Sequence, residues 1–168
     1  MNLICELNDD QYSYDYIDHI RNVARAIVIN DKNEIALIHV SGDGIFGHRD
    51  YFETPGGGVK DNELIEVAVL REILEEIGYK CKIEAPIGWV KDYYNLIHRE
   101  NHSYYFLLKI VEKEAQHLEE YEKTMFKEII WVPIQEAISL YEKMPNSGVA
   151  KLVKQRELPI LNLAKLMI

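Results

Sequence analysis

Hydrophobic positions between residues 61 and 79 recur at intervals of three and four, the spacing of one buried face of an α-helix. They are Leu64, Val67, Ala68, Leu70, Ile73, Leu74 and Ile77. Asp61 and Asn62 are the nearest residues suited to cap the helix start, and Gly78 is suited to end it in a left-handed conformation. The pattern therefore predicts an amphipathic helix that ends at Gly78.

Short apolar or alternating runs predict strands on both sides of this helix. These strands are expected at residues 22–30, 34–40, 82–94 with a break near Pro86–Gly88, 102–111 and 128–132. Helices are expected at 133–143, where Pro133 suits a first turn, and at 147–157. Polar stretches at 41–50, 95–101 and 112–125 predict loops, and the apolar segment 158–168 is expected to pack on the domain.

Strands outnumber helices, and the main helix lies between a hairpin and further strands, which favours a layered α/β fold. A chain of 168 residues suits a single domain, residues 1–168, with one sizeable core. Hydrophobic residues make up 48% and charged residues 28%, an ordinary globular composition.

Three features of the chain predict a cytoplasmic protein without a membrane partner. No apolar run is long enough to span a bilayer. The first ten residues lack the basic region and apolar stretch of a secretory signal. Cys5 and Cys81 have no metal-ligand spacing and are expected to be reduced thiols.

The formal net charge is −9, which repels long polyanions and makes a nucleic acid polymer an unfavourable partner. A small phosphorylated metabolite is compatible with this charge, because a bound metal ion can invert the local field.

The polar face of the predicted helix carries Glu72, Glu75 and Glu76, which lie within about one turn of each other. Their repulsion costs stability, and a divalent cation removes it. Carboxylates without cysteine or histidine suit Mg2+, or Mn2+ in its place. The preceding Gly56–Gly58 loop lets the backbone approach a metal or phosphate closely. The alternative interpretation is an ordinary acidic, solvent-exposed helix face.

The stretch reads Gly57-x5-Glu63-x7-Arg71-Glu72-Ile73-x-Glu75-Glu76-x-Gly78. It resembles the Nudix box, residues 57–79, of the Nudix (MutT-like) hydrolases at every fixed identity and every gap. Two positions depart from the family pattern. Tyr79 stands where an aliphatic residue is usual, and Leu64 where a serine or threonine cap is usual. The resemblance implies the Nudix fold, a mixed β-sheet sandwiched between α-helices.

The resemblance also implies an activity: metal-dependent cleavage of the pyrophosphate bond of a nucleoside diphosphate linked to another moiety. It makes Glu72, Glu75 and Glu76 the metal ligands, with a backbone carbonyl of Gly56 or Gly57 as a further ligand. Arg71 is expected to hold Glu63 in a bidentate pair and so to orient the site. The expected substrate-binding residues are Gly56, Gly57, Gly58 and Glu53. Alternatively, Arg71 and Glu75 form an ordinary helical ion pair.

The box does not identify the general base. In some family members a box glutamate serves, and in others a glutamate from a later loop supplies the base or an extra metal ligand. The later candidates are Glu100, Glu119, Glu120 and Glu122. No downstream marker identifies the substrate.

Two other functions stay open: a Nudix-fold sensor that binds a nucleotide or nucleotide sugar without cleaving it, and an isoprenyl diphosphate isomerase. The isomerase needs a catalytic cysteine, for which Cys5 and Cys81 lack a recognisable context. The aromatic N-terminal segment and the apolar tail suit a homodimer contact.

Overall fold

Eight strands form one mixed sheet in the computed structural model, which describes residues 1–168. The strands are β1 (Leu3–Leu7), β2 (His19–Ile29), β3 (Glu34–Gly44), β4 (Gly47–Glu53), β5 (Gly56–Gly58), β6 (Tyr79–Tyr94), β7 (Arg99–Lys113) and β8 (Phe126–Pro133). The helices are α1 (Ile65–Ile77), α2 (Glu120–Met125), α3 (Ile134–Lys143) and α4 (Gly148–Ala164), with a 3-10 turn at Asn95–Ile97.

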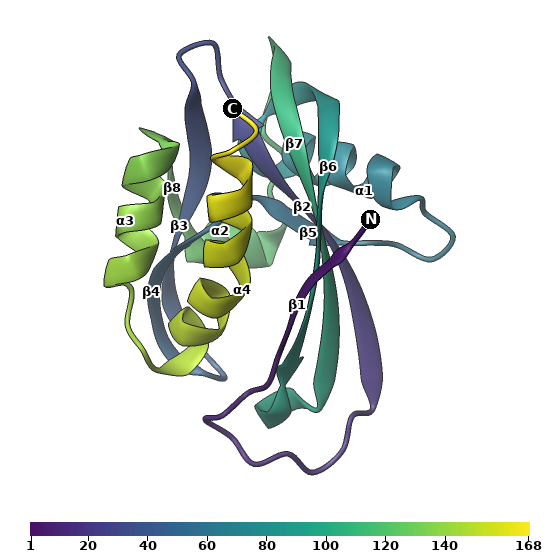
Figure 1. Ribbon diagram of the computed structural model, residues 1–168, viewed down its shortest axis with the longest axis vertical. Coiled ribbons are helices and arrows are strands. Elements are labelled where there is room, and N and C mark those ends of the chain that lie inside the picture. The colour runs from purple at the N-terminus through teal and green to yellow at the C-terminus, as the bar shows by residue number, and fades with distance from the viewer.

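The sheet lies between two layers of helices, as Figure 1 shows: α1 is behind it and α4 is in front, with α3 beside α4. The strand order is β1-β6-β7-β2-β3-β4, with β5 paired to β2 and β8 paired to β3. Pairs β1–β6 and β2–β7 are parallel and the others antiparallel. The predicted fold class is therefore confirmed.

The sheet opens between β2 and β3, which are joined at one residue pair, Ile29 with Ile35. Beyond that pair β2 instead takes β5 as its antiparallel neighbour, with Ala24 opposite Gly57. Because side chains alternate along a strand, Ala24 faces the α1 layer while Arg25 faces the α4 layer. The opening thus exposes one face of β2 to a space between the two halves of the sheet.

The core fills both sides of the central strands. It is one cluster of buried residues from β2, β3, β7, α1, α3 and α4, including Ile27, Leu37, Ile73, Leu108, Tyr141 and Ile160. Since both faces of β2 and β3 are covered, their inner segments are nearly continuous apolar runs. This continuity is what made these two strands predictable.

Two predicted loops are wrong. Residues 41–50 form the end of a hairpin, in which Ser41 pairs with Asp50 and Gly42 with Arg49. Backbone pairing holds this extension while its side chains meet water, so no apolar alternation marks it. Residues 112–125 contain the end of β7 and helix α2, whose start has a capping box between Glu119 and Glu122.

Element ends also differ from the prediction. Helix α1 begins at Ile65 after Leu64, and not at Asp61 or Asn62, since Asn62 has a left-handed φ of 61°. The Gly78 terminus is confirmed, with φ 71° and its N–H donating to the Leu74 carbonyl. Strand β6 runs unbroken through Pro86 because register shifts absorb the irregularity. Helix α4 continues past residue 157, through Pro159, to Ala164.

A buried ionic network attaches α4 to the sheet. Glu157 of α4 is 0% exposed, and its Oε2 accepts hydrogen bonds from the Thr54 N–H (2.7 Å) and the Tyr141 hydroxyl (2.6 Å). Its Oε1 accepts from Arg156 Nη2 (2.8 Å) and lies 3.5 Å from Arg25 Nη1. Burial raises the pKa of Glu157, but the two guanidiniums and Tyr141 outweigh it, so the pKa is lowered and the carboxylate is charged.

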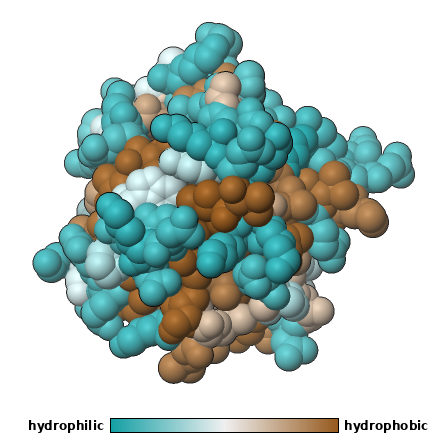
Figure 2. Space-filling view, turned by 90° about the horizontal axis from the view of Figure 1, so that it is seen from above, coloured by the Kyte–Doolittle hydropathy of each residue, from teal (hydrophilic) through white to brown (hydrophobic).

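No helix combines the length and the apolarity that a membrane crossing requires. The face seen in Figure 2 has hydrophobic residues between broader hydrophilic areas. At the C-terminus, Leu166, Met167 and Ile168 stay exposed, so the end of the predicted apolar tail does not join the core.

Replacing Glu157 with glutamine is expected to destabilise the fold. The change leaves Arg25 and Arg156 buried without their shared counter-charge, and breaking one partner of a buried pair costs about 3–5 kcal/mol. Urea unfolding measures the loss. Glu136→Gln, at an exposed position on α3, is the matched control and should unfold like the wild type. Equal midpoints for Glu157→Gln and wild type would contradict a stabilising role.

Candidate metal centre and substrate cavity

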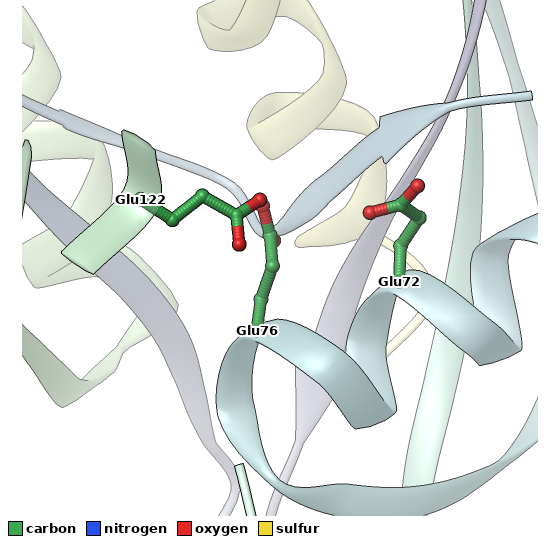
Figure 3. Close-up of side chains that lie close together, drawn as sticks. All are labelled: Glu72, Glu76 and Glu122. Atoms are coloured by element: carbon green, nitrogen blue, oxygen red, sulfur yellow. The ribbon is translucent and has the colours of Figure 1, made fainter. Parts of the chain in front are cut away.

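Three glutamates from two helices bring their carboxylates together (Figure 3). Glu72 and Glu76 lie on successive turns of α1, and Glu122 comes from α2. One oxygen from each lies within 4.8 Å of the others. Glu72 and Glu76 are buried, at 8% and 4% exposed, so their charges are poorly solvated. This group is called the carboxylate cluster below.

The backbone of β5 lies directly against the carboxylate cluster. The Gly56 N–H donates to Glu76 Oε2 at 2.6 Å. A Cβ on Gly57 would stand 2.3 Å from Glu72 Oε2, and one on Gly56 would stand 2.2 Å from the Ala24 carbonyl oxygen. Gly56 also has φ 139°. Gly57 is therefore needed because a side chain would overlap Glu72. Gly56 is needed because a side chain would overlap β2 and because of its positive φ.

Arg71 connects the helix face to its surroundings. Its Nε and Nη2 donate to the two carboxylate oxygens of Glu63, each at 2.8 Å. Its Nη1 donates to Glu72 Oε1 (2.6 Å) and Glu75 Oε2 (3.1 Å), and Nη2 also donates to the Gly58 carbonyl (3.0 Å). The Arg71 guanidinium, helped by the Lys60 N–H, lowers the pKa of Glu63 to about 2. Arg71 thus fixes the orientation of Glu72 without belonging to the cluster.

Burial dominates the electrostatics of the carboxylate cluster. It raises the pKa of Glu76 well above its ordinary value and raises the pKa values of Glu72 and Glu122, although Arg71 opposes the shift at Glu72. Three buried or half-buried carboxylates whose negative charges are poorly balanced by the protein suit a hard divalent cation. The donor set therefore fits Mg2+ or Mn2+.

The other predicted site residues lie around this cluster. The Glu75 carboxylate bonds Arg71 and lies outside the group of three. Gly56, Gly57 and Glu53 line an adjoining cavity, and Glu53 Oε2 lies 3.5 Å from Arg25 Nη2. Gly58 contributes its carbonyl to Arg71.

The four candidate glutamates that follow the box in the sequence lie in different surroundings in the structure. Glu122 belongs to the carboxylate cluster, and Glu119 lines the cavity. Glu120 is exposed and bonds Lys123, while Glu100 bonds His102 on β7 away from the cavity. Only Glu119 and Glu122 can therefore meet a ligand in the cavity.

The cavity has a volume of about 420 Å3 and extends from the carboxylate cluster across the opened sheet toward α4. Both halves of the sheet line it, together with α2 and α4. Its basic lining residues are all arginines: Arg21, Arg25, Arg49, Arg99 and Arg156. Sequence reasoning missed these residues. The available signal was the alternation Arg21-x-Val23-x-Arg25 inside an apolar strand, which places two guanidiniums on one face.

The NUDIX domain family model matches residues 19–154. The chain belongs to the NUDIX domain family. Solved structures share the fold of this NUDIX chain. A NUDIX hydrolase from Nitrosomonas europaea has a TM-score of 0.66 at 18% identity, covering 89% of this chain and 90% of that one. A MutT protein from Methanosarcina mazei Go1 has a TM-score of 0.63 at 17% identity, covering 92% and 99%.

Curated relatives match a shorter part of the NUDIX chain. An RNA pyrophosphohydrolase of Wolbachia sp. subsp. Brugia malayi (strain TRS) is 43% identical over 68 residues, 37% of this chain and 41% of the relative. A putative 8-oxo-dGTP diphosphatase of Bacillus subtilis (strain 168) is 37% identical over 65 residues, 39% of this chain and 40% of the relative. The chain thus spans well under half the length of the relatives it matches.

A methyl group at Gly57 is expected to disturb metal binding more than folding. In Gly57→Ala the new Cβ displaces the Glu72 carboxylate, which changes the position of a metal ligand. Stability should change little, because the end of the Glu72 side chain can move. We expect Mn2+ affinity, measured by calorimetry, to fall on the order of tenfold or more.

The matched control is Gly58→Ala, whose Cβ would meet Arg21 Nη2 at 3.4 Å, an ordinary contact. Both variants should unfold near the wild-type urea concentration. Equal Mn2+ affinity in Gly57→Ala and Gly58→Ala would contradict a metal site at Glu72.

Proposed function

We propose that this NUDIX protein is a divalent-metal-dependent hydrolase that cleaves the pyrophosphate bond of a nucleoside diphosphate linked to another moiety. The observation that carries the proposal is the carboxylate cluster, with oxygens within 4.8 Å, at the end of a cavity lined with arginines. Such a cavity offers a place for a cation at one end and for phosphate oxygens beside it. The names of the relatives, pyrophosphohydrolase and diphosphatase, support the same reaction class.

When bound, Mg2+ or Mn2+ would supply charge neutralisation of the diphosphate and a water of lowered pKa. Glu72, Glu76 and Glu122 would hold the ion, and a backbone carbonyl of Gly56 or Gly57 is a further candidate ligand. The remaining contacts keep these ligands in place. The Gly56 N–H positions Glu76, and Arg71 positions Glu72.

The general base must reach a water molecule inside the cavity. We therefore limit it to the carboxylates that line the cavity, which are Glu53, Glu76, Glu119 and Glu122. Glu100 and Glu120 are set aside because their carboxylates lie elsewhere. The glycines of β5 and Glu53 border the space in which the substrate phosphates would lie.

A small nucleotide-containing substrate suits this molecule better than a long polyanion, because the formal charge of −9 acts over the outer surface. The arginines act only inside the cavity. RNA with a 5′-triphosphate end still belongs in the substrate panel, since relatives are named for RNA.

The isomerase alternative is disfavoured by the position of both thiols. Neither Cys5 nor Cys81 lines the cavity, and burial raises both pKa values, that of Cys81 to about 12. A thiol that stays protonated is a poor acid–base or nucleophilic group. The sensor alternative remains one outcome of the experiment below.

Glu76→Gln is expected to reduce turnover by orders of magnitude without unfolding the protein. The change removes a metal-ligating charge whose burial is unfavourable, so the unfolding free energy should be unchanged or higher. The assay measures phosphate and mononucleotide release from nucleoside triphosphates, ADP-ribose, nucleotide sugars, NADH, dinucleoside polyphosphates and 5′-triphosphate RNA, with Mg2+, Mn2+ or EDTA.

Glu66→Gln, at an exposed position in the first turn of α1, is the control and should keep wild-type turnover. Wild-type activity in Glu76→Gln would overturn the metal-site assignment. Tight nucleotide binding without any metal-dependent release would favour the sensor.

A further inference from the structure

The arginines of this chain are gathered in one place. The 19 basic residues comprise six arginines and 13 lysines. Five arginines line the cavity and the sixth, Arg71, binds the carboxylates of α1, whereas no lysine lines the cavity. A planar guanidinium binds phosphate through two parallel hydrogen bonds and loses less hydration than an ammonium. The concentration of arginines in the cavity therefore favours phosphate binding there, whereas the lysines lie elsewhere on the molecule.

Three of the five cavity arginines have partners within the protein. Arg25 donates to the Thr54 carbonyl at 2.6 Å, and Arg156 donates to Glu157 at 2.8 Å and to the Tyr94 hydroxyl at 2.9 Å. Arg49 donates to the Tyr121 hydroxyl. Arg25 Nε and Arg49 Nε lack an acceptor, but the guanidiniums of Arg25, Arg49 and Arg156 are each held by at least one hydrogen bond to the protein.

Arg21 and Arg99 have no such partners. Neither guanidinium forms an ion pair or a hydrogen bond, and Arg99 Nε is buried without an acceptor. Arg99 lies over the Tyr94 ring at 5.1 Å from its centroid, which fixes its plane and leaves its N–H edge free. The nearby buried carboxylate, Asp92, lies 3.8 Å from Arg156. An unsatisfied buried donor of this kind is costly and points to an absent acceptor.

The two free arginines share one face of the sheet. Strands β2 and β7 are parallel neighbours, with His19 opposite Arg99 and Arg21 opposite Asn101. Arg21 and Arg99 are thus two positions apart in register and point to the same side. Burial, and then the positive charge of Arg21, lowers the pKa of Arg99 to about 10. Both side chains line the cavity that reaches Glu76 and Glu122, so an anion here would offset two like charges.

We propose that Arg21 and Arg99 bind a phosphate group of the substrate that is additional to the diphosphate at the carboxylate cluster. The inference rests on the proposed hydrolase function and names its substrate class: a nucleotide derivative with at least three phosphate groups. The cavity then holds carboxylates that a cation neutralises and two unbonded arginines that the substrate itself neutralises.

Metal-free binding tests the subsite separately from catalysis. Inorganic pyrophosphate is titrated by calorimetry in EDTA at fixed ionic strength. We expect wild-type protein to bind it, and Arg21→Gln and Arg99→Gln each to raise its Kd about tenfold. Glu76→Gln should bind it equally or more tightly. Lys109→Gln, which removes a cation from an exposed position on β7, is the charge-matched control and should not differ from wild type.

Stability separates a ligand-binding role from a structural one. Because neither Arg21 nor Arg99 has a hydrogen-bond or ion-pair partner in the protein, the glutamine variants should unfold at urea concentrations equal to or above the wild-type value. Loss of stability in both variants would show that they support the fold. Absent pyrophosphate binding, or equal binding in all variants, would overturn the subsite.

Turnover then tests the substrate class with pairs that differ by one phosphate: ADP and ATP, NADH and NADPH, ADP-ribose and its 2′-phosphate. Wild type should have a higher kcat/KM for the member with the additional phosphate in at least one pair, and the ratio of the two kcat/KM values should fall about tenfold in both arginine variants. Equal use of both members in every pair would overturn the substrate class. No metal-dependent cleavage of any compound, with pyrophosphate binding intact, would instead reject the hydrolase function and keep the subsite.

Discussion

The close approach of the β5 backbone to helix α1 is the constraint on which the centre depends. A side chain at Gly57 would occupy the position of the Glu72 carboxylate, and one at Gly56 would overlap the backbone of β2. With both absent, α1 packs close enough for the Gly56 N–H to bond Glu76. The same packing sets Arg71 within reach of Gly58 and Glu63. The orientation of the carboxylates therefore depends on the absence of side chains at Gly56 and Gly57.

A second consequence is that acidic and basic groups meet in one cavity. Acidic lining groups come from α1, α2 and β4, and basic lining groups come from β2, β4, β7 and α4. Helix α4 carries Arg156 into this space beside Glu157, which binds two guanidiniums, the Thr54 N–H and the Tyr141 hydroxyl of α3. The stability of α4 and the polarity of the cavity thus depend on the same buried carboxylate.

The parts of the centre that could be predicted from sequence are those set by local spacing. Glu72 and Glu76 share a helix face, and Gly78 ends the helix, for reasons contained within a few residues. The contribution of Glu122 could not be predicted in this way, because it requires the polar segment 112–125 to fold into α2 and return to α1. Arg21 and Arg99 lie near each other on one face of the sheet because β2 and β7 are parallel neighbours in a particular register. No local sequence pattern encodes that register. The hairpin at residues 41–50 escapes prediction for a different reason, because its pairing is local but its side chains show no apolar alternation.

Arg21 and Arg25 show how one strand face serves two purposes. They lie two residues apart on β2 and point to the same side, yet Arg25 is buried among Thr54, Glu53 and Glu157 while Arg21 is exposed and unbonded. A buried guanidinium persists only when its counter-charges are built into the fold. One that reaches the open part of the cavity can instead leave its counter-charge to a ligand. The position along β2, rather than the residue type, therefore decides whether an arginine belongs to the scaffold or to the binding surface.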